Sequence, residues 1–171
     1  MKKLILSLSV LIVFVCCTFA QKYAFVDTEY ILGNIPSYKA AQNQLDKISE
    51  EWQKEIELLY DEIEKMYKDY QAEKILLTEE LKKKREDEII NREKEAKQLQ
   101  KEYFGREGDL FKKRQELIKP IQDEIYNAVK EIASDGNFAV IFDTASGPSI
   151  LFSDPKYDKS DEVLEKLGYK N

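Results

Sequence analysis

A long run of helical hydrophobic spacing constrains this chain more than any other feature. From Tyr38 to Tyr70 apolar residues recur at steps of three and four, with one extra step of four between Trp52 and Ile56. This spacing is typical of a helix that packs along one seam against a partner helix. The seam residues are Tyr38, Ala41, Leu45, Ile48, Trp52, Ile56, Leu59, Ile63, Met66 and Tyr70.

A second seam of matching spacing follows a short interruption and predicts the partner. Thr78 is a favourable helix N-cap, and Glu79 and Glu80 follow it. The second seam mirrors the first about a turn near Leu77, including the extra step of four. Its positions are Arg85, Ile89, Arg92, Ala96, Leu99, Tyr103, Glu107, Leu110, Arg114 and Leu117. The pattern predicts an antiparallel helical hairpin over residues 37–117, with each helix about 60 Å long.

The segments on either side of the hairpin, residues 21–36 and 118–171, predict a small head. Strands are expected at Lys22–Asp27, Phe138–Asp143 and Ser149–Phe152, and a last helix at Asp161–Leu167. The predicted fold is therefore α+β and mostly α, a small β-containing head with a long inserted antiparallel helical hairpin (a coiled-coil tentacle). A head of about 70 residues is marginal alone, so oligomerisation through the head is expected.

The N-terminus has the pattern of a targeting segment. Two lysines precede the apolar run Leu4–Val15, which is too short to span a bilayer. Residues 1–20 are predicted to be a secretory signal peptide, with cleavage before Gln21. A lipoprotein signal acylated on Cys16 or Cys17 is the alternative, which the bulky side chains before these cysteines disfavour. With cleavage before Gln21, export is expected and the predicted mature chain contains no cysteine.

Composition argues against an enzyme and against several kinds of partner. The chain has no histidine, the commonest general base and metal ligand, and its net charge is −6. An acidic chain is a poor binder of nucleic acid. We find no phosphate-binding loop, zinc spacing or nucleophile motif, and predict no catalytic residue, metal or cofactor. Asp27-Thr28 and Asp143-Thr144 resemble aspartic protease motifs but lack the following glycine, so capping of a strand end is the preferred interpretation.

One basic run lies close to the predicted tip of the hairpin. It consists of Lys82, Lys83, Lys84 and Arg85, with acidic residues on both sides. Such a run usually forms a solvated helix face with ion pairs between successive turns. Contact with the phosphates of lipopolysaccharide or anionic lipid is the functional alternative.

Four aromatic residues lie outside the seams. Tyr60 and Tyr67 are seven residues apart on the first helix, and Phe104 and Phe111 are seven apart on the second. Because a two-helix arm has no other core, exposed aromatic residues in it indicate a partner or client surface. Packing of these rings within the protein is the alternative.

Two glycines, Gly105 and Gly108, interrupt the second helix and predict a hinge. Each costs up to about 1 kcal/mol relative to alanine in a helix interior. Replacing both with alanine is therefore expected to stiffen the arm. The alternative is that the glycines permit a close approach to a neighbouring helix or to the head.

The ends of the chain resemble a known family. The segments YAFVDTEYILGNIPSYKAAQNQLD and GNFAVIFDTASGPSILFSDPKYDKSDEVLEKLG flank a charged helical hairpin and are similar to the Skp/OmpH family of periplasmic chaperones. The resemblance implies a homotrimer whose helical tentacles enclose a cavity that holds unfolded outer-membrane proteins without ATP. It therefore implies a periplasmic holdase, for which the alternative is a structural or adaptor coiled-coil protein that binds a folded partner.

Charge separates this chain from the best-known members of the resembled family, which are strongly basic. Because the present chain is acidic, the resemblance supports neither electrostatic capture of clients nor a lipopolysaccharide site. An apolar grip by Tyr60, Tyr67, Phe104 and Phe111 is the mechanism that remains.

Overall fold

The computed structural model describes residues 22–145, 147 and 150–169. The predicted signal peptide, its cleavage site and the lipoprotein alternative lie outside these residues. The chain forms two compact units, Ile35–Glu124, called here the arm unit, and the chain on either side of it, called the head unit. The arm unit begins two residues earlier than the sequence predicts and ends seven residues later, within a helix.

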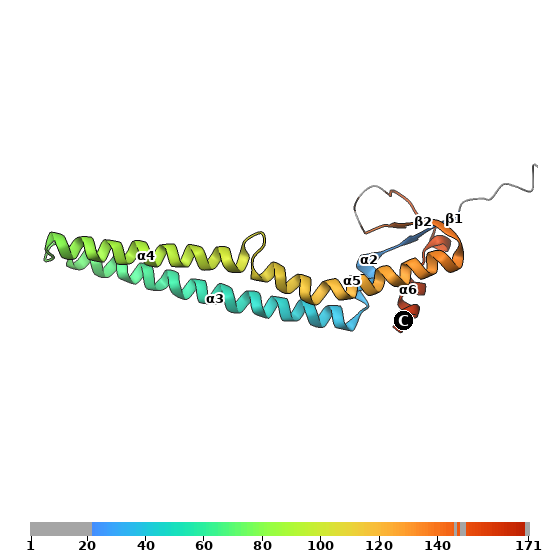
Figure 1. Ribbon diagram of the computed structural model, residues 1–171, viewed down its shortest axis with the longest axis horizontal. Coiled ribbons are helices and arrows are strands. Elements are labelled where there is room, and N and C mark those ends of the chain that lie inside the picture. The colour runs from blue at the N-terminus through green and yellow to red at the C-terminus, as the bar shows by residue number, and fades with distance from the viewer. Residues whose placement is uncertain (1–21, 146, 148–149, 170–171) are drawn as a thin grey trace, which may run out of the picture. The chain divides into compact units, whose positions relative to one another are not determined.

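The arm unit is built around two antiparallel helices, α3 (Pro36–Glu73) and α4 (Glu79–Phe104) (Figure 1). Proline suits the first turn of α3 because it lacks the N–H that would have no partner there. At the start of α4 the Thr78 hydroxyl accepts a hydrogen bond from the Leu81 N–H at 3.4 Å. The turn between the helices lies where the sequence predicts it.

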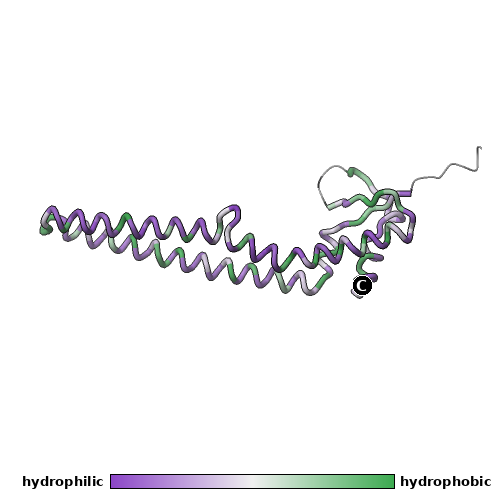
Figure 2. The backbone as a smooth tube through the Cα atoms, viewed as in Figure 1, coloured by the Kyte–Doolittle hydropathy of each residue, from purple (hydrophilic) through white to green (hydrophobic). Residues whose placement is uncertain are grey.

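The predicted seam of α3 is confirmed. All ten of its positions are buried or half-buried, and apolar residues recur along the tube of this helix in Figure 2. Towards the tip, Ile63 and Tyr70 of α3 form a buried cluster with Ile89 and Ala96 of α4, and Leu59, Met66 and Leu77 pack against it. The arm therefore encloses a continuous apolar seam of its own.

The second arm helix is broken where the sequence predicts it to be continuous. Gly105–Gly108 leave the helix as a loop, and α5 (Asp109–Gly136) begins after it (Figure 1). Arg85, Glu107 and Arg114, expected in the seam, are exposed, whereas Ile118 and Ile121 are buried. The predicted pairing is wrong beyond Tyr103, because the loop removes four residues from the helical count.

The head unit contains a two-stranded parallel sheet of β1 (Lys22–Val26) and β2 (Phe138–Asp143), in which Ala24 lies opposite Ile141. The unit also holds the end of α5 from Ile125 and two short helices, α2 (Thr28–Gly33) and α6 (Ser160–Lys166), which contact each other. Their apolar faces supply side chains that are almost completely buried, namely Ile31, Val163 and Leu164. The mostly α fold with a small β-containing head is therefore confirmed.

The predicted third strand is wrong over its described part. Ile150–Phe152 form no strand, and a 3-10 helix (η1, Pro155–Tyr157) follows. The free edge of β1 is occupied instead by the chain after η1. Phe25 forms a parallel bridge with Asp158, and the Lys159 N–H donates to the Phe25 carbonyl at 2.8 Å.

The last helix ends at Lys166, one residue earlier than the sequence predicts and two residues before a glycine. Gly168 has a φ of +86°, a conformation that favours glycine over residues with a side chain. The next residue, Tyr169, donates its N–H to the Leu164 carbonyl at 2.8 Å, which closes the C-terminal turn.

Candidate functional site

Apolar side chains outside the seam are exposed along the arm unit. Tyr60 and Tyr67 on α3 are 40% and 43% exposed, and Phe111 on α5 is 43% exposed. These three match the expectation of exposed aromatic residues. The structure adds aliphatic residues that the sequence analysis missed. The set, called here the arm apolar surface, is Leu58, Tyr60, Tyr67, Ile75, Leu76, Leu81, Ile90 and Phe111.

Phe104 differs from the other three predicted aromatic residues. Trp52 stacks on Tyr103 with ring centroids 4.5 Å apart, and Phe104 meets both rings edge-on at 6.4 Å. Phe104 is therefore half-buried in an aromatic cluster. The loop also separates it from Phe111, so their spacing of seven does not place them on one face of a continuous helix.

The tip of the hairpin carries the most exposed aliphatic pair of the described arm. Ile75 is 93% exposed and Leu76 is 86% exposed, whereas the next residue, Leu77, packs against the buried cluster. The signal for this pair was present in the sequence as three consecutive apolar residues between the two seams. A tight turn can direct only part of such a run into the core.

The basic run near the tip is partly neutralised by its neighbours. Lys82 pairs with Glu79 at 2.6 Å, and Arg85 pairs with Glu88 at 3.4 Å. Lys83 and Lys84 are exposed and form no ion pair within the described part of the chain. Two of the four cations of this run are therefore available to solvent or to a phosphate.

Polar bonds link the two helices beside the seam. The Tyr103 hydroxyl donates to Glu55 at 2.9 Å, and the Tyr70 hydroxyl donates to Glu86. Arg92 donates to Glu62 at 2.5 Å from its terminal nitrogen. The hydrogen bond to Glu86, together with burial and the carboxylate charge, raises the pKa of Tyr70 to about 12.

These bonds predict a loss of arm stability at alkaline pH. A tyrosine whose pKa is raised by folding stabilises the fold fully below its unfolded value near 10 and loses this contribution as pH rises towards 12. The difference in unfolding free energy between the wild type and Tyr70→Phe should therefore shrink between pH 9 and 12, measured by urea unfolding. Tyr60→Phe is the control, and an unchanged Tyr70→Phe difference would contradict the prediction.

The loop Gly105–Gly108 needs both of its glycines in its present conformation. A Cβ on Gly105 would lie 2.3 Å from the Lys101 carbonyl oxygen, and one on Gly108 would lie 2.6 Å from the Glu102 carbonyl oxygen. These distances are far below van der Waals contact. The expectation that alanine would stiffen the arm is therefore wrong for this loop, because alanine would displace its backbone.

The strand-ending aspartates of the head unit have structural partners. The Asp143 carboxylate accepts hydrogen bonds from the Thr28 hydroxyl at 2.8 Å and from the Ala145 N–H at 3.0 Å. Asp27 accepts from the Tyr30 N–H at 2.9 Å and caps α2. These bonds agree with the interpretation that each aspartate ends a strand and caps the adjoining segment.

The head unit also exposes apolar residues. Val140 and Phe142 of β2 are 46% and 45% exposed, and Leu151 and Phe152 are exposed almost completely. Among the described residues β2 pairs with β1 alone. Both a strand edge and an apolar surface are therefore open on this unit.

Two absences among the described residues bear on membranes and metals. None of their helices combines the length and the apolar character that crossing a membrane requires. Nor do these residues bring together three or more histidine, cysteine, aspartate or glutamate side chains in a way that could hold a metal ion.

Comparison with known proteins gives a family and a fold. No curated protein sequence matches the chain significantly. A crystal structure of a putative outer membrane chaperone (OmpH-like) from Caulobacter crescentus CB15 is similar, with a TM-score of 0.68 at 13% identity, over 86% of this chain and 83% of that one. At this identity the likeness concerns the fold. The family described as "Outer membrane protein (OmpH-like)" matches residues 22–167, and the chain belongs to this OmpH-like family.

Proposed function

We propose that the protein is an ATP-independent holdase chaperone of the periplasm that binds unfolded outer-membrane proteins. The observation that carries the proposal is the arm apolar surface, which lies outside a seam that is already filled. Exposed apolar side chains spaced along an arm suit many weak contacts with an unfolded chain. Membership of the OmpH-like family supports a chaperone role, and a structural relative bears the description of an outer membrane chaperone.

The proposal includes a homotrimer assembled through the head unit. Such an assembly would cover the exposed apolar residues of β2, together with Leu151 and Phe152. Several arms around a shared space would also multiply weak contacts with one client, because each contact raises the effective concentration of the next.

Two further elements of the arm belong to the proposal. Gly105 and Gly108 would act as a hinge that lets the space between arms widen for larger clients. Lys83 and Lys84, within the run Lys82–Arg85, would make peripheral contact with anionic lipid or lipopolysaccharide. Because the whole chain carries a formal charge of −6, contact with anionic lipid or lipopolysaccharide would be confined to this basic run near the tip.

Serine replacement of the exposed aromatic residues tests the proposed grip. Tyr60, Tyr67 and Phe111 should be changed together, while Phe104 is kept because it packs within the protein. Burying one large apolar side chain contributes about 1.5–3 kcal/mol, so losing three partial contacts should weaken client binding at least about tenfold. Affinity is measured by fluorescence titration with several unrelated unfolded β-barrel proteins.

A matched control keeps the number of changes constant. Glu57, Asp61 and Lys97 are exposed arm residues without an ion pair in the described chain, and their replacement by serine should leave affinity unchanged. Sedimentation of both variants tests whether they keep the wild-type assembly, which should be a trimer. Equal affinity of wild type and aromatic variant for every client would contradict the grip.

The same titration separates the holdase from the alternative, an adaptor coiled-coil protein that binds a folded partner. A holdase should bind several unrelated unfolded proteins and keep them soluble. An adaptor should bind none of them.

A further inference from the structure

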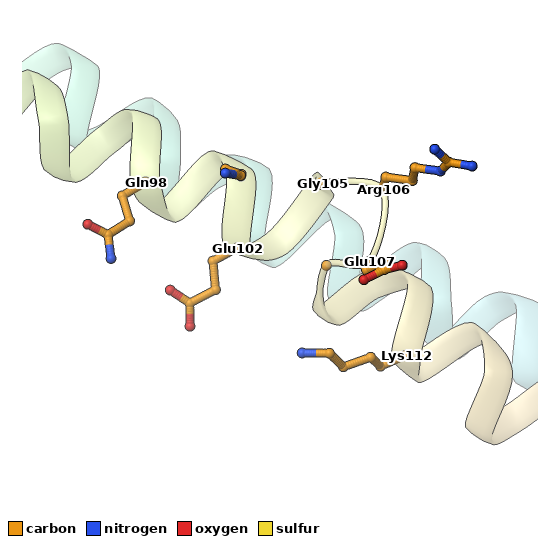
Figure 3. A pocket seen from close by; sticks show the side chains of 8 residues that line it. Gln98, Glu102, Gly105, Arg106, Glu107 and Lys112 are labelled. Atoms are coloured by element: carbon orange, nitrogen blue, oxygen red, sulfur yellow. The ribbon is translucent and has the colours of Figure 1, made fainter.

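The break in the second arm helix leaves an open notch in the arm. Its volume is about 530 Å³, and the end of α4, the loop and the first turn of α5 line it (Figure 3). The notch residues are Gln98, Lys101, Glu102, Gly105–Gly108 and Lys112.

Only one of the two arm helices is interrupted at the notch. On the second helix the helical bonding stops at the Gly105 N–H, which donates to Lys101, and resumes at the Lys112 N–H, which donates to Gly108. By contrast α3 is continuous over Pro36–Glu73. A pair of helices with one continuous member and one broken member bends most easily at the break. Such bending either closes or widens the notch.

Opposite charges extend into the notch from its two sides. Glu102 projects from α4, and Lys112 extends from α5 towards it (Figure 3). Lys112 bonds Asp109 on its own helix at 2.8 Å, whereas Glu102 forms no ion pair among the described residues. The pKa of Lys112 is raised, first by the hydrogen bond with Asp109, then by the charge of Asp109, and further by the charge of Glu102. Glu102 and Lys112 therefore face the same opening with opposite charges.

We propose that the arm bends in one direction, towards the notch, and that Glu102 and Lys112 form an ion pair that holds the bent form. The inference rests on the proposed hinge at Gly105–Gly108 and adds its direction and its latch. Since both groups are exposed, the latch is weak and sensitive to salt. The arm would accordingly exchange between straight and bent forms.

Spin labels on the notch side of the arm test the direction of bending. Asn91 lies seven residues before Gln98, and Glu116 lies four residues after Lys112, so helical spacing places both on the notch side. Each is exposed and can carry a label through cysteine in the protein purified from the periplasm. Pulsed electron paramagnetic resonance should give two distances, the shorter one from the bent form.

Charge variants test the latch. Glu102→Lys and Lys112→Glu should each lower the ratio of bent to straight arms about threefold, the size expected for an exposed ion pair. The double swap should restore the ratio, and salt at about 0.5 M should lower it in the wild type. As a matched control, reversing both charges of the exposed pair Glu64–Lys68 on α3 should change nothing.

Deletion of Gly105–Gly108 separates failure of the hinge from failure of the latch. One narrow distance in both wild type and deletion would overturn the hinge and this inference with it. A second outcome is that the wild type shows two distances, the deletion shows one, and the charge variants keep the wild-type ratio of bent to straight arms. That outcome would overturn the latch and leave the hinge. The latch would also be overturned if the double swap kept the lowered ratio of bent to straight arms seen in the single variants.

Discussion

Replacing Leu164 by alanine is expected to unfold the head unit while the arm helices persist. Leu164 is 1% exposed on α6, which contacts α2, where Ile31 is completely buried. Removing a buried leucine side chain to alanine costs about 2–5 kcal/mol, because the transfer energy is lost and a cavity remains. A small domain has a total stability of about 5–15 kcal/mol, and this head core is small. If the heads hold the oligomer together, the variant should also dissociate.

Hydrogen exchange resolved by segment measures this outcome. Peptides from β1, β2 and α6 should lose protection in Leu164→Ala, whereas peptides around Ile89 and Ala96 should keep theirs. Glu165→Ala, an exposed change on the same helix, is the control and should leave both units protected. Loss of protection in both units together would show that the arm depends on the head for its stability.

Deleting Gly105–Gly108 is expected to stabilise the arm and to make it rigid. Without these four residues Leu110 follows Tyr103 at a spacing of three. The buried Ile118 and Ile121 follow Leu110 by eight and eleven residues, spacings that lie within one apolar helix stripe. The helix ends at the loop leave backbone groups without helical partners, and joining them allows several new bonds of about 0.5–1.5 kcal/mol each. The free energy of unfolding of the arm should therefore rise by at least about 2 kcal/mol.

Gly108→Ala is the matched change in the opposite direction. Its Cβ would meet the Glu102 carbonyl oxygen at 2.6 Å and the Tyr103 carbonyl oxygen at 2.8 Å, so the loop must shift and stability should fall. Both variants are measured by thermal unfolding followed by circular dichroism. A deletion that lowers the melting temperature would show that α4 and α5 are not in phase and that the loop is needed for packing.

The seam of α3 and the hairpin turn could be predicted because each rests on local spacing. The error beyond Tyr103 has a geometric cause. Four residues make slightly more than one helical turn. A continuous helix with an extra step of four and a helix with four residues looped out therefore show nearly the same spacing of apolar residues in the sequence. The two glycines and the charged seam positions Glu107 and Arg114 were the available signs of the loop.

The other differences come from tertiary context. The run Ile150–Phe152 has strand-like residues, but residue type alone does not decide pairing. Asp158 takes the edge of β1, and the other edge of β2 stays unpaired among the described residues. Spacing likewise placed Tyr60 and Tyr67 outside the seam, where they are exposed. It could not show that Trp52 would draw Phe104 into a cluster, because that contact joins residues far apart in the sequence.

The stacked pair of Trp52 and Tyr103 gives the arm an intrinsic optical probe. Trp52 is the single tryptophan of the chain, so all indole emission originates at this one place. Its stacking partner is two residues before Gly105, and a change in the 4.5 Å separation of the rings would alter emission wavelength and lifetime. Motion of the arm during client binding could therefore be followed in the unlabelled protein, at nanomolar concentration and in real time.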